Sequence, residues 1–316
     1  MFLCFLSCMF LYIWKQRTKT PPGPKRIPLL GSLPFLPTDK GIFDWVLDKK
    51  VTKHKLARVD LGPNPVYLIN DFGLAKDLFD KEEFSGRTPS NIQLLHRFFN
   101  GTPNGIVFTQ EEQWSTQRRF SLKTLKEFGF GKRHIEDSIH FEVEELTEKF
   151  LSGNGDKLIG MDFNVPIINI LWQMDADSRF TTEDQAGMKM VDNVTKIFTT
   201  GMKVEKIPIP ICRLFPIWTG YTERVDAMRG ILNHLMDVIK HHEDELDPAN
   251  PKDFIDVYLN EIQNQAYGED FNRQDLIGCI YDFFIAGTET SSSTLKWIVL
   301  YLTLYEDVQD RYYPNI

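Results

Sequence analysis

The stretch from Asp275 to Tyr305, DLIGCIYDFFIAGTETSSSTLKWIVLYLTLY, constrains the fold of this chain more than any other. It holds no proline and no clear turn signal, so it predicts one continuous helix about 45 Å long. Its apolar surface is interrupted only between Ala286 and Thr294, where the sequence reads AGTETSSST. Because unpaired polar groups inside a protein cost free energy, we expect a polar site halfway along this buried helix.

Composition narrows the class of protein. With 316 residues, 42% hydrophobic residues and 24 Phe, the chain can build a large globular core. Its net charge of −8 argues against general nucleic-acid binding, which needs a basic surface. The scatter of the four cysteines predicts reduced thiols rather than a disulfide framework. No Cys pair or Cys/His cluster of the zinc-binding kind is present, so no metal site is predicted. The cysteines are Cys4, Cys8, Cys212 and Cys279.

The N-terminal 14 residues, MFLCFLSCMFLYIW, carry no charge and are followed at once by Lys15, Arg17 and Lys19. As a helix they would span about 21 Å, less than the roughly 30 Å of a hydrocarbon core. Basic residues after the apolar run favour an incomplete signal-anchor over a cleaved signal, with the rest of the chain in the cytoplasm. A buried N-terminal helix is the alternative. We therefore expect an anchor at 1–14, a basic and Pro-rich hinge at 15–38, and one domain at 39–316.

The remaining periodicity is mostly helical. Only Leu56–Leu61 and Val66–Asn70 alternate as strands, around a Gly62-Pro63-Asn64 turn. Asn272 is a plausible cap for the long helix. The fold class predicted is mainly α with a small early sheet. The other helices are expected at Gly73–Asp80, Glu111–Phe128, His134–Leu151 (with Ile135, Ile139, Val143 and Leu146 inward), Val165–Met174, Met188–Thr199, Thr222–Glu245 and Asp253–Gln263.

Two apolar stretches lack periodicity. Ser85–Phe108 is punctuated by Gly and Pro, and its length and apolar content favour a binding wall over disorder. Ile207–Tyr221, IPIPICRLFPIWTGY, is predicted to be a loop that exposes a hydrophobic patch. Such a patch marks a membrane or partner contact more often than a plain surface loop.

Several local patterns occur together and in one order. They are PPGP at 21–24, FSGR at 84–87, GIVF at 105–108 leading into WSTQRRFSL at 114–122, DPANPKDFIDVYL at 247–259, and AGTETS at 286–291. Together they resemble the microsomal cytochrome P-450 monooxygenases, specifically the animal branch that metabolises xenobiotics, steroids and fatty acids. The resemblance runs from the N-terminus to about Gln309. It implies the cytochrome P-450 fold, a haem cofactor and insertion of one oxygen atom of O2 into a small lipophilic substrate.

The resemblance assigns roles within the long helix. Ala286 and Gly287 would form a notch that faces the haem, since Ala286 and Thr290 share one helix face. Thr290 would donate into a proton relay, and Glu289 would supply protons. The alternative from the residues alone is that the hydroxyls bond back to the preceding turn and only bend a core helix.

The resemblance also assigns roles elsewhere. Trp114 and Arg118, at i and i+4, would bind a haem propionate, and the alternative is an aromatic ring packed under an arginine stem. Substrate contacts are expected from the apolar side chains Phe98, Phe99, Ile106 and Phe283. Expected partners are an NADPH-dependent reductase and the endoplasmic reticulum membrane, with the domain on its cytoplasmic face.

The resemblance stops after Arg311. The family's Glu-x-x-Arg pair and its Phe-x-x-Gly-x-x-x-Cys-x-Gly loop, which supplies the thiolate ligand of the iron, have no counterpart here. Cys279 precedes Ala286 by seven residues on the helix across the haem, so it cannot replace that ligand. The interpretation is a C-terminally truncated monooxygenase, inactive as this chain alone. The alternative is a short, non-catalytic membrane-associated protein.

Overall fold

A computed structural model describes residues 20–27, 30–35, 53–62, 64–87, 89, 101–130, 134–152, 163–176, 178–181, 184–204, 209–266 and 271–312. The predicted anchor at 1–14 lies outside these ranges. The chain divides into two compact units, Met1–Ser85 and Gly86–Ile316. Among the helices described, none combines the length and apolar character needed to cross a bilayer.

The first unit contains the predicted hairpin. Strand β1 (Leu56–Leu61) pairs antiparallel with β2 (Asn64–Ile69), and the register runs from Leu56 opposite Ile69 to Leu61 opposite Asn64. Strand β2 therefore starts two residues before its predicted position. Helix α4 (Phe72–Phe79) follows, and the side chain of Asp71 caps it by accepting a hydrogen bond from Leu74 N. Single 3-10 turns lie at Leu33–Phe35 and Glu82–Phe84.

The PPGP segment lies directly against β1. The backbone N–H of Arg58 donates to the carbonyl oxygen of Pro22 over 2.9 Å. A Cβ placed on Gly23 would come within 1.8 Å of the carbonyl oxygen of Arg58, so only glycine fits this approach. This part of the predicted hinge is thus fixed to the sheet by its backbone.

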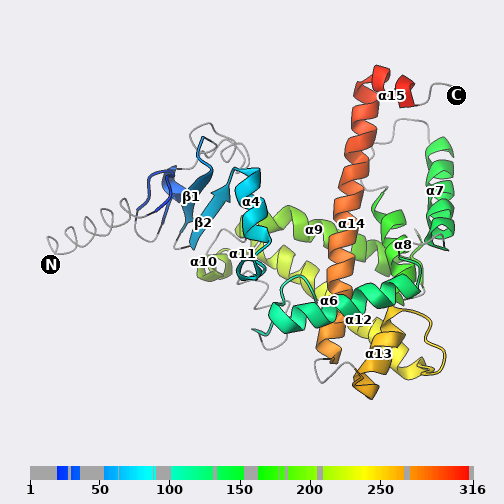
Figure 1. The fold of residues 1–316 in the computed structure, drawn as a ribbon. Helices are drawn as coiled ribbons and strands as arrows, with labels where there is room; N and C mark the ends of the chain where they lie inside the picture. Colours follow the sequence, from blue (N-terminus) through cyan, green and yellow to red (C-terminus); the bar gives the residue numbers. More distant parts are fainter. Residues whose placement is uncertain are drawn as a thin grey trace. The chain divides into compact units, whose positions relative to one another are not determined.

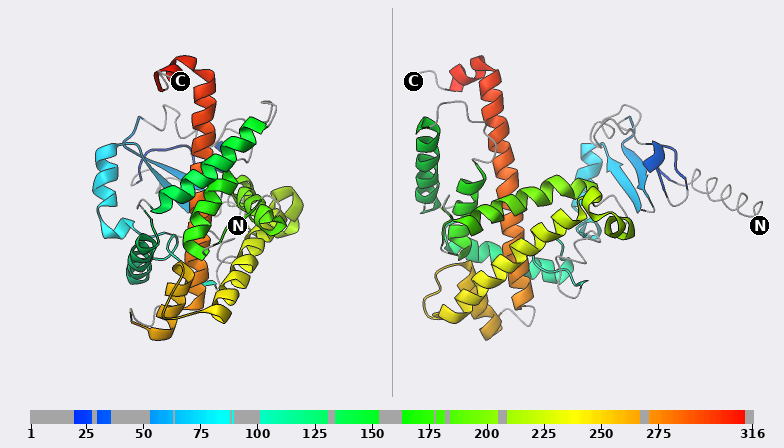
Figure 2. Two further views of the ribbon diagram at one scale, coloured as in Figure 1. Left: turned by 90° about the vertical axis from the view of Figure 1, so that its right-hand side faces the viewer. Right: turned by 180° about the vertical axis from the view of Figure 1, so that it is seen from behind.

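The second unit is a stack of helices around α14 (Arg273–Leu304), which runs through it as the long, mostly orange helix of Figure 1. Helices α9 and α12 lie side by side, as both views of Figure 2 show, and α8 packs along α14. The other helices are α6 (Glu111–Glu127), α7 (His134–Ser152), α8 (Asn164–Ala176), α9 (Gln185–Val204), α10 (Ile209–Leu214), α11 (Pro216–Thr219), α12 (Tyr221–Glu245), α13 (Phe254–Asn264) and α15 (Glu306–Tyr312).

Aromatic side chains fill the junctions between these helices. Phe120 of α6 meets the ring of Tyr258 of α13 edge-on, with centroids 5.3 Å apart. On the other side of the core, Trp172 of α8 stacks on Phe180 at 5.5 Å and meets Phe284 of α14 edge-on at 5.8 Å. Each such pair stabilises the fold by about 0.5–1.5 kcal/mol beyond the contribution of the apolar area that it buries. The core therefore joins α6, α8, α13 and the first half of α14.

The predicted inward face of α7 is wrong in part. Ile139 and Val143 are exposed, whereas Glu142 between them is buried. The carboxylate of Glu142 accepts a hydrogen bond from Asn169 Nδ2 over 3.1 Å and forms an ion pair with Arg179. These polar partners, supplied by α8 and the segment after it, rotate α7 so that a paired carboxylate rather than an aliphatic row faces inward.

The predicted loop at 207–221 is also wrong in part, because it contains the short helices α10 and α11. Pro210 stands in the first turn of α10 and Pro216 begins α11, positions where proline costs no helical hydrogen bond. Gly220, with φ of 76°, ends α11. The predicted exposure is confirmed: Ile217 is 90% and Trp218 79% exposed.

Candidate functional site around α14

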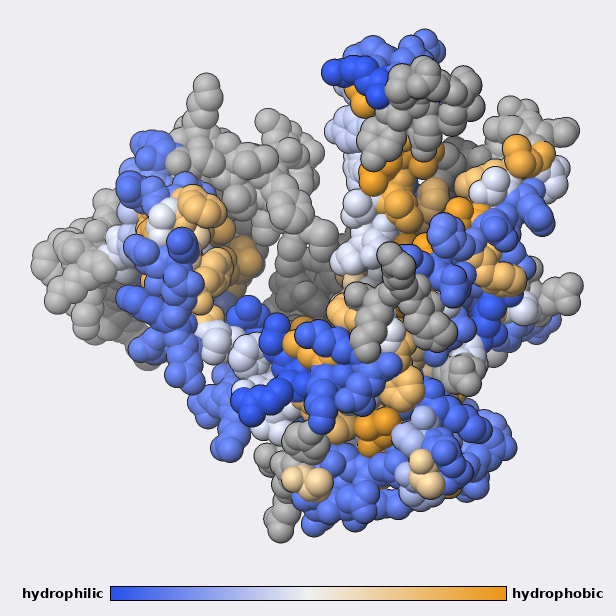
Figure 3. All heavy atoms as spheres, turned by 45° about the vertical axis from the view of Figure 1, so that its right-hand side comes forward, coloured by the Kyte–Doolittle hydropathy of each residue, from blue (hydrophilic) through white to orange (hydrophobic). Residues whose placement is uncertain are grey.

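Helix α14 divides into a buried and an exposed half. Asn272 caps it by accepting hydrogen bonds from Gln274 N and Asp275 N, which confirms the predicted cap. Up to Phe284 its apolar side chains are mostly buried. Beyond the polar interruption they are exposed, and Figure 3 shows hydrophobic side chains gathered on this part of α14 below α15. The exposed residues are Leu295, Trp297, Ile298, Leu300, Tyr301 and Leu304.

The hydroxyl groups of the polar interruption bond back to the helix itself. Thr288 donates to the carbonyl oxygen of Phe284, Thr290 to that of Ala286 and Ser292 to that of Thr288, each over 2.7 Å. Each of these hydroxyls thus has an acceptor one turn earlier, the arrangement typical of Ser and Thr inside helices. Thr288 and Ser292 are buried, whereas Thr290 is exposed.

The small residues of the interruption face in two directions. Ala286 and Thr290, four residues apart, are both exposed and share one face. Gly287 instead faces α8, where a Cβ would lie 2.4 Å from Cδ1 of Leu171. The missing side chain of Gly287 therefore lets two helices approach, and the exposed notch consists of Ala286 and Thr290.

Glu289 lies on a third face and is half-buried. Its Oε1 accepts a hydrogen bond from Ser293 Oγ over 3.2 Å. Its Oε2 is buried and has no hydrogen-bond partner within the part of the chain that the structure describes. Glu289 thus places a carboxyl group with one unbonded oxygen one position before Thr290.

Helix α6 carries the predicted Trp-x-x-x-Arg pair on its free side. The guanidinium carbon of Arg118 lies 5.7 Å from the centroid of the Trp114 ring, and both side chains are exposed. The opposite side of α6 is tied to the core. There Gln113 Nε2 donates to Asp275 Oδ1 over 3.1 Å, and the buried Gln117 accepts from Tyr258 OH over 2.8 Å. No ion pair is found for Arg118 among the described residues, so its guanidinium can bind an added carboxylate.

Two carboxylates of α14 hold the segment that precedes α6. Asp282 accepts hydrogen bonds from Ile106 N over 2.8 Å and from Val107 N over 2.9 Å. Asp275 accepts one from Gly105 N over 3.3 Å. Sequence reasoning missed this clamp, although two acidic residues seven apart on an apolar helix were a usable signal. The clamp fixes Ile106, a predicted substrate contact, beside α14.

The other predicted substrate contacts are placed less completely. Phe283 is half-buried and meets Phe254 of α13 edge-on at 5.3 Å, so it also belongs to the core. It shares a helix face with Ala286 and Thr290 by its spacing of three and seven residues. Phe98 and Phe99 lie outside the described residues. The second unit thus contains the notch, Arg118 and two of the four predicted substrate contacts, Ile106 and Phe283, on elements joined through α14.

Comparison with known proteins gives the family. A family model described as Cytochrome P450 matches residues 21–316. The chain belongs to the cytochrome P450 family. This agrees with the mainly α fold and the small N-terminal sheet predicted from the sequence.

Individual relatives are similarly named. The chain is 31% identical to cytochrome P450 2G1 of Oryctolagus cuniculus over 99% of its length and 65% of the relative. It is 30% identical to cytochrome P450 2C44 of Mus musculus over 98% of its length and 64% of the relative. For cytochrome P450 2C26 of Mesocricetus auratus the identity is 32%, over 96% and 63%. The chain thus spans slightly less than two thirds of these cytochromes P450.

Proposed function

We propose that this chain is part of a haem-dependent monooxygenase, which inserts one oxygen atom of O2 into a small lipophilic substrate. The observation that carries the proposal is the exposed face of α14 at Ala286 and Thr290. A small side chain followed one turn later by a hydroxyl leaves a shallow polar notch on an otherwise packed helix. Membership of the cytochrome P450 family supports the cofactor.

The residues present fit a haem. Ala286 offers a low surface on which a flat macrocycle can lie, and the exposed guanidinium of Arg118 suits a propionate. Trp114 holds that guanidinium over its ring, which limits its freedom before binding. Gly287 is left out of this set because it faces Leu171. When bound, the haem supplies the redox chemistry of dioxygen.

Thr290 and Glu289 are proposed to manage protons. Insertion of one oxygen atom releases the other as water, which takes up two protons. The Thr290 hydroxyl now donates to Ala286 O, and rotation about its Cα–Cβ bond would redirect that proton outward. Glu289, with a buried Oε2 that has no donor within the described chain, is the neighbouring acid. General acids placed in this way contribute about 10²–10⁴-fold to rates.

The surroundings suit a lipophilic substrate at a membrane. Ile106 and Phe283, with Phe98 and Phe99 from the sequence, would form an apolar wall. The exposed Ile217 and Trp218 of α11 are proposed to dip into the endoplasmic reticulum bilayer from its cytoplasmic side. The electron donor would be an NADPH-dependent reductase.

The test compares Thr290→Ala with Ser291→Ala, an exposed hydroxyl on the next helical position. The chain is first extended by the family's thiolate loop and loaded with haem. With reductase and a lipophilic probe, Thr290→Ala in this extended form should then lower product formed per O2 consumed several-fold, while Ser291→Ala should not. If both variants form the same amount of product per O2 consumed, Thr290 has no role in proton delivery. Arg118→Leu should release haem faster than Arg119→Leu, its exposed neighbour.

The alternative is a membrane-associated protein without chemistry. It predicts vesicle binding that depends on Ile217 and Trp218, no retained haem, and no difference between the Arg118 and Arg119 variants. Haem retention therefore separates the two.

A further inference from the structure

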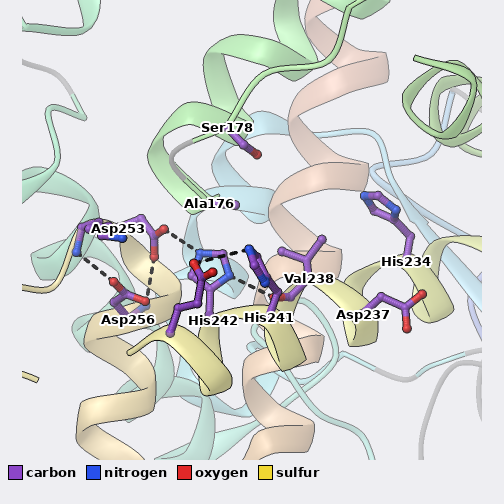
Figure 4. Close-up of a pocket in the computed structure, with 11 residues that line it drawn as sticks. Ala176, Ser178, His234, Asp237, Val238, His241, His242, Asp253 and Asp256 are labelled. Atoms are coloured by element: carbon purple, nitrogen blue, oxygen red, sulfur yellow. Dashed lines mark hydrogen bonds and ion pairs between the residues drawn. The ribbon is translucent and has the colours of Figure 1, made fainter. Parts of the chain in front are cut away.

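Three ligand groups meet where α12 ends and α13 begins, away from the notch at Ala286. They are the imidazole of His242 and the carboxylates of Asp253 and Asp256, whose ligand atoms all lie within 4.8 Å of one another. Figure 4 shows His242 and Asp253 pointing toward each other, with Asp256 beside Asp253. The cluster lines a cavity of about 480 Å³. Sequence reasoning sought Cys pairs and Cys/His clusters, so it passed over this combination.

Backbone groups hold the two carboxylates in place. Asp253 caps α13, and its Oδ1 accepts a hydrogen bond from Asp256 N over 2.9 Å. Oδ2 of Asp256 accepts one from Lys252 N over 3.0 Å. Asp253 and Asp256 are both buried. Their positions are therefore set by the start of the helix and would need little rearrangement to bind an ion.

Both ring nitrogens of His242 have a partner. Its Nδ1 lies 2.9 Å from the carbonyl oxygen of Val238, which can only accept, so Nδ1 carries the hydrogen. Nε2 lies 2.8 Å from Asp253 Oδ2, and the two form an ion pair when the ring is protonated. A metal ion bound to both atoms would take the place of that shared proton. Histidine ligands of metals almost always have their other ring nitrogen bonded in this way.

We propose that His242, Asp253 and Asp256 bind a divalent transition-metal ion, of which Zn²⁺ is the best match. One imidazole and two carboxylates are ligands typical of zinc, whereas Mg²⁺ and Ca²⁺ prefer oxygen alone. Three protein ligands leave the fourth position to water from the cavity. The ion would connect the end of α12 to the start of α13. The proposed metal site does not depend on the proposed haem chemistry.

The experiment measures Zn²⁺ binding to the chelator-treated 316-residue chain by competition with a chromogenic chelator. Asp256→Asn keeps an oxygen for Lys252 N but loses the charge, so it should fold and bind at least about tenfold more weakly, as should His242→Ala. His241→Ala is the matched control, because that side chain is 68% exposed and pairs with Glu245. Wild type and His241→Ala should bind Zn²⁺ equally tightly.

Two results would overturn the site. One is equal Zn²⁺ stoichiometry and affinity in Asp256→Asn, shown by circular dichroism to be folded, and in wild type. The other is Mg²⁺ displacing Zn²⁺ at equal concentration. In either case the contact between His242 and Asp253 is a proton-bridged pair only.

Discussion

Gly105 and Gly278 meet backbone against backbone where the segment before α6 crosses α14. A Cβ on Gly105 would lie 2.6 Å from the carbonyl carbon of Gly278, and one on Gly278 would lie 2.6 Å from Gly105 N. Gly105 also has a φ of 78°, which side chains rarely adopt. Because the atoms in the way belong to the backbone, no side-chain rotation relieves the contact. The crossing therefore requires glycine in both segments, at position 105 and at position 278.

Substitution of Gly278 by alanine should destabilise the second unit. Overpacking of this kind costs about 1–3 kcal/mol. Urea unfolding followed by circular dichroism would measure it. Gly86→Ala is the control, because its Cβ would meet only the side-chain end of the exposed Gln110, at 3.1 Å. Equal midpoints for the two variants would contradict the close approach.

Removal of the Asp282 carboxylate should loosen the segment at 105–107. Asp282→Ala leaves Ile106 N and Val107 N without their acceptor, and the loss of a hydrogen bond to a charged group costs about 1.5–3 kcal/mol. Amide hydrogen exchange at these two residues should accelerate before global unfolding. Asp226→Ala, an exposed carboxylate on α12, should leave both amides unchanged. Unaltered exchange in the Asp282 variant would show that α14 does not hold the segment.

The free energy of unfolding should decrease as the pH falls, and we expect His234 to contribute to this decrease. Its burial lowers the pKa of the ring, although Asp184 and Asp237 oppose this. The unfolded chain therefore binds the proton first, so stability is lost as pH drops below the ordinary histidine pKa of about 6.5. His234→Phe should flatten the dependence, since the ring lies among aromatic side chains, with Trp172 at 6.0 Å. Unfolding at pH 7.5 and 5.5 with chelator present tests this, and His241→Phe should behave like wild type.

Charge placed on α11 should weaken membrane binding. Burial of a large apolar side chain contributes about 1.5–3 kcal/mol, so Ile217→Asp with Trp218→Asp should reduce vesicle affinity by more than about tenfold. Because both side chains are largely exposed, unfolding midpoints should not move. Leu151→Asp, 80% exposed on α7, is the control in vesicle sedimentation. An equal loss of vesicle affinity for Leu151→Asp would indicate nonspecific hydrophobic adsorption rather than a defined membrane contact at α11.

Local sequence predicted what depends on local physics. The long stretch without proline or turn signals placed α14 within two residues of its ends, and Asn272 was recognisable as its cap because capping involves neighbours. The hairpin at 56–69 was similarly visible from strand alternation around Gly62.

Features that depend on distant partners were not predictable in this way. The sequence shows that Gly287 is small, but not that Leu171 occupies the space beside it. Glu142 became buried, and Val143 exposed, because Asn169 and Arg179 offered polar partners from other elements. The bonds from Ile106 and Val107 to Asp282 join residues about 175 positions apart. Orientation around a helix axis is a property of the whole packing.

The division of α14 into a buried and an exposed half has a consequence for the order in which the protein is made. The partners of its buried half, on α6, α8, α9, α12 and α13, all precede it in the chain. As synthesis proceeds, Leu276 to Phe284 can therefore pack as soon as they leave the ribosome. In the aromatic row that follows, the ring of Tyr301 contacts that of Trp297 at 6.0 Å and stacks on that of Tyr305 at 6.0 Å. Among the described residues these three rings make no other ring contact. A nascent chain stalled after this row would therefore combine a folded core with an exposed hydrophobic segment. Chaperones bind chains of this kind.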